Sequence, residues 1–133
     1  MPSNKDLVKG FFNSEFYKDE AEFKRFIHPE VEVKWNGSTG FLNLDYTTFK
    51  ELVLEMGKSF VSMEAEVSHI LEEKNQVAIR FSYHVEMVEE EEMIPLADFI
   101  CIWEIKDNLL YKGFFVSQPS DTNIDSLYSF FPN

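Results

Sequence analysis

The sequence has a single cysteine, Cys101, among its 133 residues. One cysteine cannot build a disulfide framework or a cysteine-based zinc site. No apolar stretch approaches the roughly 20 residues that a membrane-spanning helix needs, and the first twelve residues lack the apolar core of a signal peptide. These features predict a cytoplasmic protein that has no membrane segment, disulfide or zinc centre.

Basic residues are also scarce. The chain has 12 Lys and Arg against 24 Asp and Glu, so its formal net charge is −12 at pH 7. A nucleic-acid-binding surface needs clustered positive charge, and we therefore expect no nucleic-acid partner. The acidic run Glu89–Glu92 is typical of a solvated hairpin tip rather than a metal site, because neighbouring residues on a strand end point apart. No cofactor motif is present, and we expect neither a metal nor a cofactor.

Aromatic and aliphatic residues are abundant by contrast. Hydrophobic residues make up 44% of the chain, and 14 of them are Phe. A chain of this length is the size of one ordinary domain, and it buries about two-thirds of its unfolded surface on folding. Residues 1–133 are therefore predicted to form a single domain with its own core.

Three helical segments are expected in the first sixty residues. Apolar side chains recur at spacings of three and four over Leu7–Phe16 and over Phe49–Phe60, which gathers them on one side of a helix. A shorter segment, Phe23–Ile27, lies between them. Asp19 and Asp45 are the expected N-caps of the second and third helices.

Alternation of apolar and polar residues predicts one strand before the third helix and four antiparallel strands after it. The predicted strands are Val31–Trp35, Met63–Leu71, Val77–Glu86, Leu96–Ile105 and Leu109–Ser117. Asp107 and Asn108 form the expected tight turn between the last two. Helices that precede a sheet must cover one of its faces. We therefore predict an α+β fold in which three N-terminal helices pack on a curved antiparallel sheet.

The two faces of this sheet differ in composition. The odd-numbered face of the late strands is assigned to the interior, since it carries Phe81, Tyr83, Phe99, Cys101, Trp103, Tyr111 and Phe115. The outer face carries Ile100, Ile102, Phe114 and Val116 on adjacent strands. We expect these to pack against a second copy of the chain in a homodimer; scattered exposed apolar residues are the alternative. The segment Ile124–Phe131 is also apolar and is expected to dock against another surface.

This order of elements resembles the nuclear transport factor 2-like superfamily over about residues 3–121, and the SnoaL-like domains most. The resemblance lies in Phe26-Ile27-His28-Pro29-Glu30-Val31, in the Gly-Ser-Thr-Gly turn after the first strand, and in the penultimate hairpin Phe99–Leu110. It implies the cystatin-like cone of that superfamily, with a pocket between helices and sheet. Its members include steroid isomerases, polyketide cyclases, dehydratases, epoxide hydrolases and non-catalytic binding proteins, so the resemblance leaves the function open.

The isomerase branch of the superfamily uses a general-base aspartate late on the first strand, a protonated aspartic acid on the penultimate strand, and a tyrosine on the first helix. The two acid positions correspond here to Trp35 and Ala97. The tyrosine position corresponds to Phe11 or Phe12. None of these side chains can move a proton. Asp98 adjoins the second acid position and would face inward only after a one-residue bulge.

Three functions follow from this reading. The first is a binding domain for a small hydrophobic molecule, in a pocket walled by Trp35, Phe81, Phe99, Trp103, Tyr111 and Phe115. The second is a SnoaL-like enzyme (a cyclase, isomerase or dehydratase) that abstracts a proton next to a carbonyl. There His69 would be the base, and Tyr83 or Tyr111 would stabilise the enolate; a packing role in the core is the alternative for each. The third is a protein-interaction or dimerisation module that uses the outer face.

Overall fold

The computed structural model describes residues 3–38, 40–87 and 92–119. Its helices and strands are α1 (Asn4–Phe12), α2 (Glu20–Phe26), β1 (Ile27–Gly37), β2 (Gly40–Leu44), α3 (Tyr46–Gly57), β3 (Phe60–Glu73), β4 (Gln76–Met87), β5 (Met93–Lys106) and β6 (Leu109–Pro119). The segment Ile124–Phe131 and all but the last residue of Glu89–Glu92 lie outside the described residues, so the expectations for them stay predictions.

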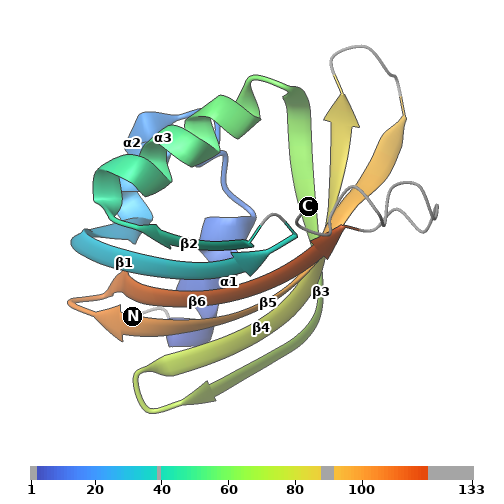
Figure 1. The fold of residues 1–133 in the computed structure, drawn as a ribbon. Coiled ribbons are helices and arrows are strands. Elements are labelled where there is room, and N and C mark those ends of the chain that lie inside the picture. The colour runs from blue at the N-terminus through green and yellow to red at the C-terminus, as the bar shows by residue number, and fades with distance from the viewer. Residues whose placement is uncertain (1–2, 39, 88–91, 120–133) are drawn as a thin grey trace.

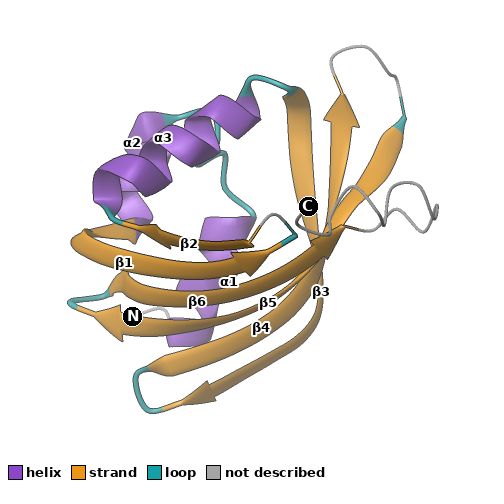
Figure 2. Ribbon diagram, viewed as in Figure 1, coloured by secondary structure: helices purple, strands orange, loops and turns teal. Residues whose placement is uncertain are grey.

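The strands form one sheet in the order β2-β1-β6-β5-β4-β3. All neighbours are antiparallel except β1 and β6, which run parallel. The sheet curves without closing, and the three helices lie on its concave side (Figures 1 and 2). The predicted α+β cone of three helices on a curved sheet is confirmed, and it contains one parallel pairing that the sequence pattern does not reveal.

Each helix begins at a polar cap that satisfies its first free backbone N–H groups. The Asp19 side chain accepts from the N–H of Ala21 in α2, and the Asp45 side chain accepts from the N–H of Thr48 in α3. The two caps expected from the sequence are therefore confirmed. In α3 the Thr48 hydroxyl also accepts from the N–H of Asp45, so the pair closes a reciprocal capping box.

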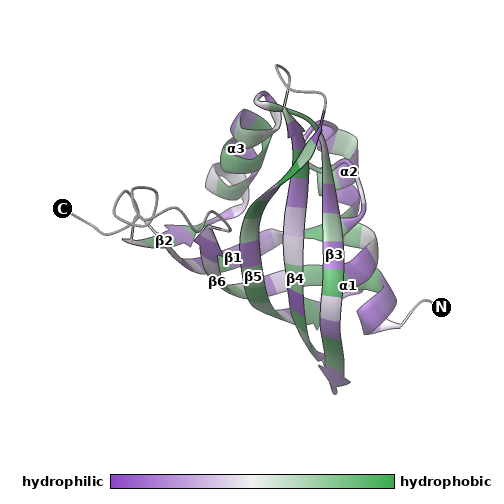
Figure 3. Cartoon of the chain, turned by 90° about the vertical axis from the view of Figure 1, so that its right-hand side faces the viewer, coloured by the Kyte–Doolittle hydropathy of each residue, from purple (hydrophilic) through white to green (hydrophobic). Residues whose placement is uncertain are grey.

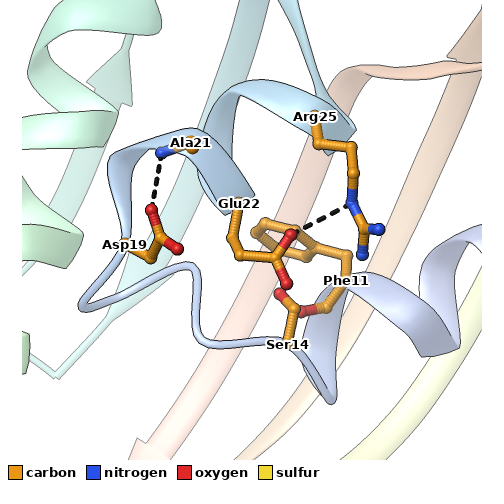
Figure 4. A network of polar contacts seen from close by, with 6 residues as sticks. All are labelled: Phe11, Ser14, Asp19, Ala21, Glu22 and Arg25. Carbon is orange, nitrogen blue, oxygen red and sulfur yellow. Dashed lines mark hydrogen bonds and ion pairs between the residues drawn. The ribbon is translucent and has the colours of Figure 1, made fainter.

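The first helix is shorter than its apolar spacing predicts. It ends at Phe12 instead of continuing to Phe16, and the Ser14 hydroxyl turns back to donate to the Phe11 carbonyl at 2.6 Å (Figure 4). A side-chain hydroxyl that bonds to the preceding turn competes with helix continuation. Phe16 is still buried and stacks on Phe11 with ring centroids 4.2 Å apart, so it faces the core from the connecting turn.

The region around the first strand also differs from the sequence prediction. β1 begins at Ile27, directly after α2, rather than at Val31. The residues after the turn at Gly37 form β2, which pairs back onto β1. Gly40 begins β2 with φ of +118°, a conformation that only glycine adopts without strain. β2 has little apolar alternation of its own, so its pairing rather than its pattern makes it a strand.

The core lies between the helices and the inner face of the sheet. Its largest fully buried side chains include Phe11, Phe23, Phe49, Phe81 and Trp103. Burying one such side chain contributes about 1.5–3 kcal/mol. Ring contacts join helix and sheet, for example Phe11 to Trp103 at 6.1 Å between centroids. These contacts hold α1 and α3 at the distance from the sheet that shapes the candidate site.

The outer face of the sheet has the composition that the sequence predicts. The exposed fractions of its four central apolar residues are 53% for Ile100, 41% for Ile102, 41% for Phe114 and 57% for Val116. In Figure 3 the sheet lies in front of α1 and α2, and β5 is hydrophobic along much of its length. No helix of the described residues is long and apolar enough to span a membrane.

Candidate functional site

An apolar cavity lies between α1, α3 and the inner face of the sheet. Its space for the centre of a water molecule is about 30 Å³, enough for about two waters. It is lined by Phe11, Phe12, Phe16, Trp35, Phe49, Val53, Met56, Tyr83, Leu96, Phe99 and Phe115. None of these side chains carries a charge, so the cavity suits an uncharged occupant.

Phe99 lies at the centre of the sheet wall of this cavity. Its ring is parallel to that of Phe81 at 5.2 Å, and it meets the rings of Tyr83 at 5.7 Å and Trp35 at 5.6 Å. Phe115 closes the wall against Trp35 at 5.4 Å. Offset and edge-to-face contacts of this kind stabilise aromatic clusters beyond simple area burial, so the sheet side of the cavity is a rigid surface.

The outer rim of the cavity is formed by its half-buried members, Trp35, Met56 and Leu96. The Trp35 ring N–H donates to the Ser117 hydroxyl at 2.8 Å, which fixes the indole in place. Leu96 is the extra residue of a β-bulge in β5, and a bulge re-aims the side chain that it carries. Met56 is unbranched and flexible. The rim therefore combines one fixed ring with two aliphatic side chains that can change rotamer.

Among the described residues that line the cavity, Tyr83 alone carries a hydroxyl. Its side chain is 3% exposed, and its hydroxyl finds no hydrogen-bond partner in the described part of the chain. Burial raises the pKa of Tyr83 well above its ordinary value, and the Cys101 thiol and the Tyr17 hydroxyl raise it further. The hydroxyl is therefore neutral at physiological pH and has a proton to donate. A buried polar group without a partner is rare in native proteins and calls for an explanation.

Tyr17, which the sequence analysis did not single out, supplies a second buried hydroxyl. It comes from the turn between α1 and α2, and its oxygen accepts from the backbone N–H of Met63 at 2.8 Å. Burial raises the pKa of Tyr17, while that hydrogen bond lowers it and the Glu15 carboxylate raises it. The only sequence signal for this residue is its place directly after Phe16. Its hydroxyl is satisfied, in contrast to that of Tyr83.

Cys101 lies on the inner face and is fully buried. Burial raises the pKa of its thiol well above the ordinary value. A thiol that stays protonated is a poor nucleophile. Cys101 therefore packs in the core, in line with the sequence analysis, which assigned it no chemical role.

His69 does not lie in the cavity, and its predicted inward orientation is wrong. The β3–β4 register places Val67 opposite Phe81 but His69 opposite Arg80, so Ser68 is an extra residue in β3. A one-residue bulge reverses the alternation of the side chains that follow it. The His69 side chain is exposed on the outer face, where its Nδ1 lies 3.0 Å from the Ser68 hydroxyl.

Tyr111 is also misplaced by the alternation rule. The β5–β6 register shifts at this residue, which makes it the extra residue of a bulge in β6. Its half-buried ring packs on the edge of His28 at 4.9 Å between centroids, outside the cavity lining. His28 is itself fixed there, because its Nδ1 accepts from the N–H of Glu30 at 3.0 Å and its Nε2 lies 3.5 Å from an Asp107 carboxylate oxygen.

The other predicted wall residues separate into two groups. Trp35, Phe99 and Phe115 line the cavity, whereas Phe81 and Trp103 are buried against the lining rings without forming its surface. The helix-borne side chains of the lining were not among the predicted wall residues. They are Phe11, Phe12, Phe16, Phe49, Val53 and Met56. The helical spacing of these residues in the sequence could have identified them. The apolar side of a helix that packs on a sheet also faces any cavity between the helix and the sheet.

No family model matches the sequence, and no curated protein matches it significantly. Solved structures do match. IdmH of Streptomyces antibioticus, a candidate polyketide cyclase, is 15% identical with a TM-score of 0.71, and the match covers 96% of this chain and 99% of that one. A nuclear transport factor 2-like protein of unknown function from Burkholderia pseudomallei K96243 is 11% identical with a TM-score of 0.66, over 100% of both chains.

The chain has the nuclear transport factor 2-like fold. A candidate SnoaL-like polyketide cyclase from Shewanella denitrificans OS-217 gives the same result, with 8% identity, a TM-score of 0.67, and 97% of this chain and 96% of that chain covered. Structural similarity at identities this low shows only the fold, so the activity has to be inferred from the residues of this chain. The resemblance that the sequence analysis drew is therefore confirmed at the level of the fold.

Within this nuclear transport factor 2-like fold, the positions that correspond to the isomerase acids hold no acid. Trp35 lies at the cavity rim, and Ala97 is half-buried beside Leu96. Asp98 points to the outer face, where its carboxylate accepts from the Ser82 hydroxyl. Among the residues that the structure describes, no cluster of three or more His, Cys, Asp or Glu could hold a metal ion.

Proposed function

We propose that the chain is a binding domain for an uncharged aromatic molecule that carries a hydrogen-bond acceptor. The binding site is the cavity between α1, α3 and the sheet. The single observation that supports this most is Tyr83, whose side chain lines the cavity and whose buried hydroxyl has no hydrogen-bond partner within the described residues. A ligand oxygen placed against it would satisfy a donor that otherwise costs about 1–3 kcal/mol.

The electrostatics of the cavity select for neutral ligands. Its lining carries no charged side chain, and the acidic groups buried nearby, Tyr17, Tyr83 and Cys101, all have raised pKa values. A buried charge without a partner is strongly disfavoured. The net charge of −12 repels anions at long range as well. A carboxylate or phosphate ligand would have nothing here to pair with.

The size of the cavity requires the rim to move. Sites for small molecules have volumes of roughly 300–1,000 Å³, whereas the space present is about 30 Å³. Trp35 is held by Ser117, so opening depends on Met56 and Leu96, whose aliphatic side chains are half-buried at the rim. Rotation of these two side chains would enlarge the cavity without breaking a side-chain hydrogen bond.

The enzymatic alternative finds less support in the described residues. Proton abstraction next to a carbonyl needs a base within reach of the substrate. His69, the predicted base, is on the outer face, and so is Asp98. Tyr83 could polarise a carbonyl, but no described side chain of the lining can accept the proton. These residues can bind and orient a carbonyl compound, and binding is the function that they support.

A matched pair of ligands tests the proposal. Fluorenone and fluorene are neutral aromatic molecules that differ in one carbonyl group. The wild-type chain is expected to bind both, as followed by quenching of the fluorescence of its two tryptophans, Trp35 and Trp103. It is expected to bind fluorenone about 2- to 12-fold more tightly, which corresponds to one neutral hydrogen bond of about 0.5–1.5 kcal/mol.

Two variants sharpen this test. In Tyr83→Phe the preference for fluorenone is expected to disappear, while fluorene binds unchanged. Tyr111→Phe also removes one phenolic hydroxyl but outside the cavity, and it is expected to keep the preference. Failure of the folded wild-type chain to bind either compound would overturn the proposed function, and an unchanged preference in Tyr83→Phe would overturn the role of its hydroxyl.

A further inference from the structure

The described part of the chain ends beside the rim of the cavity. Its last residue, Pro119, is half-buried in β6 and pairs with Ala97, the neighbour of the rim residue Leu96. Two residues earlier, the Ser117 hydroxyl accepts from the Trp35 ring N–H at 2.8 Å. β1 and β6 run parallel and end on the same side of the molecule (Figure 1). The rest of the chain therefore continues from a point next to the rim.

The rim presents an apolar surface that the described residues cover only in part. Trp35 and Met56 are half-buried there. The β1–β2 register adds Leu42, which lies opposite Trp35, and residues directly opposite each other on antiparallel strands point to the same side of the sheet. The Leu42 side chain is 41% exposed. Together with Leu96 these residues form the rim surface, and an apolar partner that covered it would remove it from water.

The end of the sequence supplies a partner of this chemistry. The apolar residues of the C-terminal segment Ile124–Phe131 are Ile124, Leu127, Tyr128, Phe130 and Phe131. Asp125 is its one charged side chain. A segment this rich in apolar residues gains free energy when it is buried against another apolar surface. The rim surface is uncharged as well, so the two match in chemistry.

The segment is long enough to reach the rim surface of its own chain. An extended chain spans at most about 3.3–3.6 Å per residue, so Ile124 can lie up to about 17 Å from Pro119. The pairing of Ala97 with Pro119 and the bond between Trp35 and Ser117 put the rim well inside this radius. The apolar outer face is reached less directly, because alternation along β6 turns Ser117 and Pro119 to the cavity side.

We propose that the C-terminal segment Ile124–Phe131 binds to the rim surface of its own chain and closes the cavity when no ligand is present. Its aromatic side chains then cover Trp35 and Met56, which a ligand has to pass, so segment and ligand compete. The affinity for a ligand is lowered by the fraction of chains in which the cavity is open. The docking depends on the segment and the rim surface alone, whereas the competition rests in addition on the proposed function.

Quenching of a bimane label by tryptophan tests the docking without a ligand. The label is attached to the full chain through Ser129→Cys, and the native Cys101 is fully buried and does not react. Contact with a tryptophan side chain quenches bimane, and Trp103 is fully buried, so the quenching reports contact with Trp35. We expect the label to be quenched in the wild-type background and to lose that quenching in Trp35→Phe.

The same label on Leu71→Cys is the control. Leu71 is 69% exposed near the end of β3 and outside the cavity lining, and Trp35→Phe is expected to leave this label unchanged. An unquenched label on Ser129→Cys, or an equal response at both positions, overturns the docking. Quenching that returns when the labelled Trp35→Phe chain is mixed with unlabelled wild type would come from a second copy, and it would overturn the assignment to the same chain.

Fluorene binding to full-length variants tests the competition. Leu127→Asp puts a charge into a segment that has to bind an uncharged surface, and a buried charge without a partner is strongly disfavoured. A segment docked about nine-tenths of the time weakens binding about tenfold, and Leu127→Asp is expected to recover that factor. Leu71→Asp adds the same charge away from the rim and is expected to bind fluorene as wild type does.

The outcomes separate this inference from the proposed function. Equal fluorene affinities of Leu127→Asp and wild type overturn the competition. If none of the three chains binds fluorene while the label on Ser129→Cys is quenched by Trp35, the proposed function and the competition are both wrong and the docking is supported. Circular dichroism confirms that each variant is folded.

Discussion

Replacing Tyr83 by Phe is expected to stabilise the unliganded protein. The hydroxyl is buried and finds no partner among the described residues, so the folded state carries its desolvation cost, whereas the unfolded state hydrates it. Such a group costs about 1–3 kcal/mol. The Phe ring keeps the contacts with Phe81 and Phe99 that the Tyr ring makes. We expect the free energy of unfolding to rise by about 1 kcal/mol.

Tyr17→Phe is the matched control for this prediction. It also removes one buried phenolic hydroxyl, but that oxygen accepts from the Met63 N–H, and its loss leaves a buried donor unpaired. We expect Tyr17→Phe to lower the free energy of unfolding by about 1–3 kcal/mol. The two substitutions are chemically identical, so their opposite signs would come only from the hydrogen-bonding environment.

Urea unfolding of the two variants and the wild type measures both effects. The dependence of the free energy on urea should stay the same in all three, because the surface exposed on unfolding is unchanged. If Tyr83→Phe destabilises the protein as much as Tyr17→Phe does, the Tyr83 hydroxyl has a partner in the unliganded protein. The reasoning that makes it a ligand donor would then be refuted.

Three further predictions concern stability. Tyr17, Tyr83 and Cys101 have pKa values raised in the folded state, so the unfolded chain loses these protons first. Their contribution to the free energy of unfolding should therefore be fully present below about pH 8, where the unfolded cysteine is still protonated, and should be lost as the pH rises. Unfolding followed by phenolate absorbance at a series of alkaline pH values measures this, and a constant free energy of unfolding up to about pH 11 would contradict it. Gly57→Ala should cost about 3 kcal/mol or more, because a Cβ there would lie 1.9 Å from the Tyr17 carbonyl oxygen, and thermal unfolding that matches wild type would refute this close approach. Lys74 has φ of +56°, so Lys74→Gly should be more stable than Lys74→Ala by about 1 kcal/mol in urea unfolding; Lys74→Ala removes the same charge, and equal stabilities would refute the strain.

Local patterns in the sequence were enough to predict the layers of the fold. The spacing of Phe49, Val53 and Met56 predicted a helix with one buried side, and those residues do face the sheet and the cavity. The alternation of Phe99 and Ile100 correctly separated the inner from the outer face. These predictions hold because hydrophobic periodicity depends only on the geometry of a helix or strand and on the cost of exposing apolar surface.

The two site residues whose orientation was predicted wrongly share one cause. His69 and Tyr111 follow the alternation in the sequence, but each lies at or directly after a one-residue bulge. A bulge depends on how two strands pair over their whole length, and no local pattern marks the extra residue. The chemistry assigned to His69 depended on its inward orientation, and that orientation changed with a single residue of register.

By itself, the sequence of this protein determined the three helices, the caps of the second and third, the two faces of the sheet, and the absence of charge from the inner strands. Tertiary structure alone decided the parallel contact of β1 with β6, the positions of the bulges, and the small volume that remains between helix and sheet. The spacing of apolar residues indicates which side of a helix or strand is buried. Pairing register and cavity volume depend instead on how elements far apart in the chain fit together, and they become defined only when the elements pack.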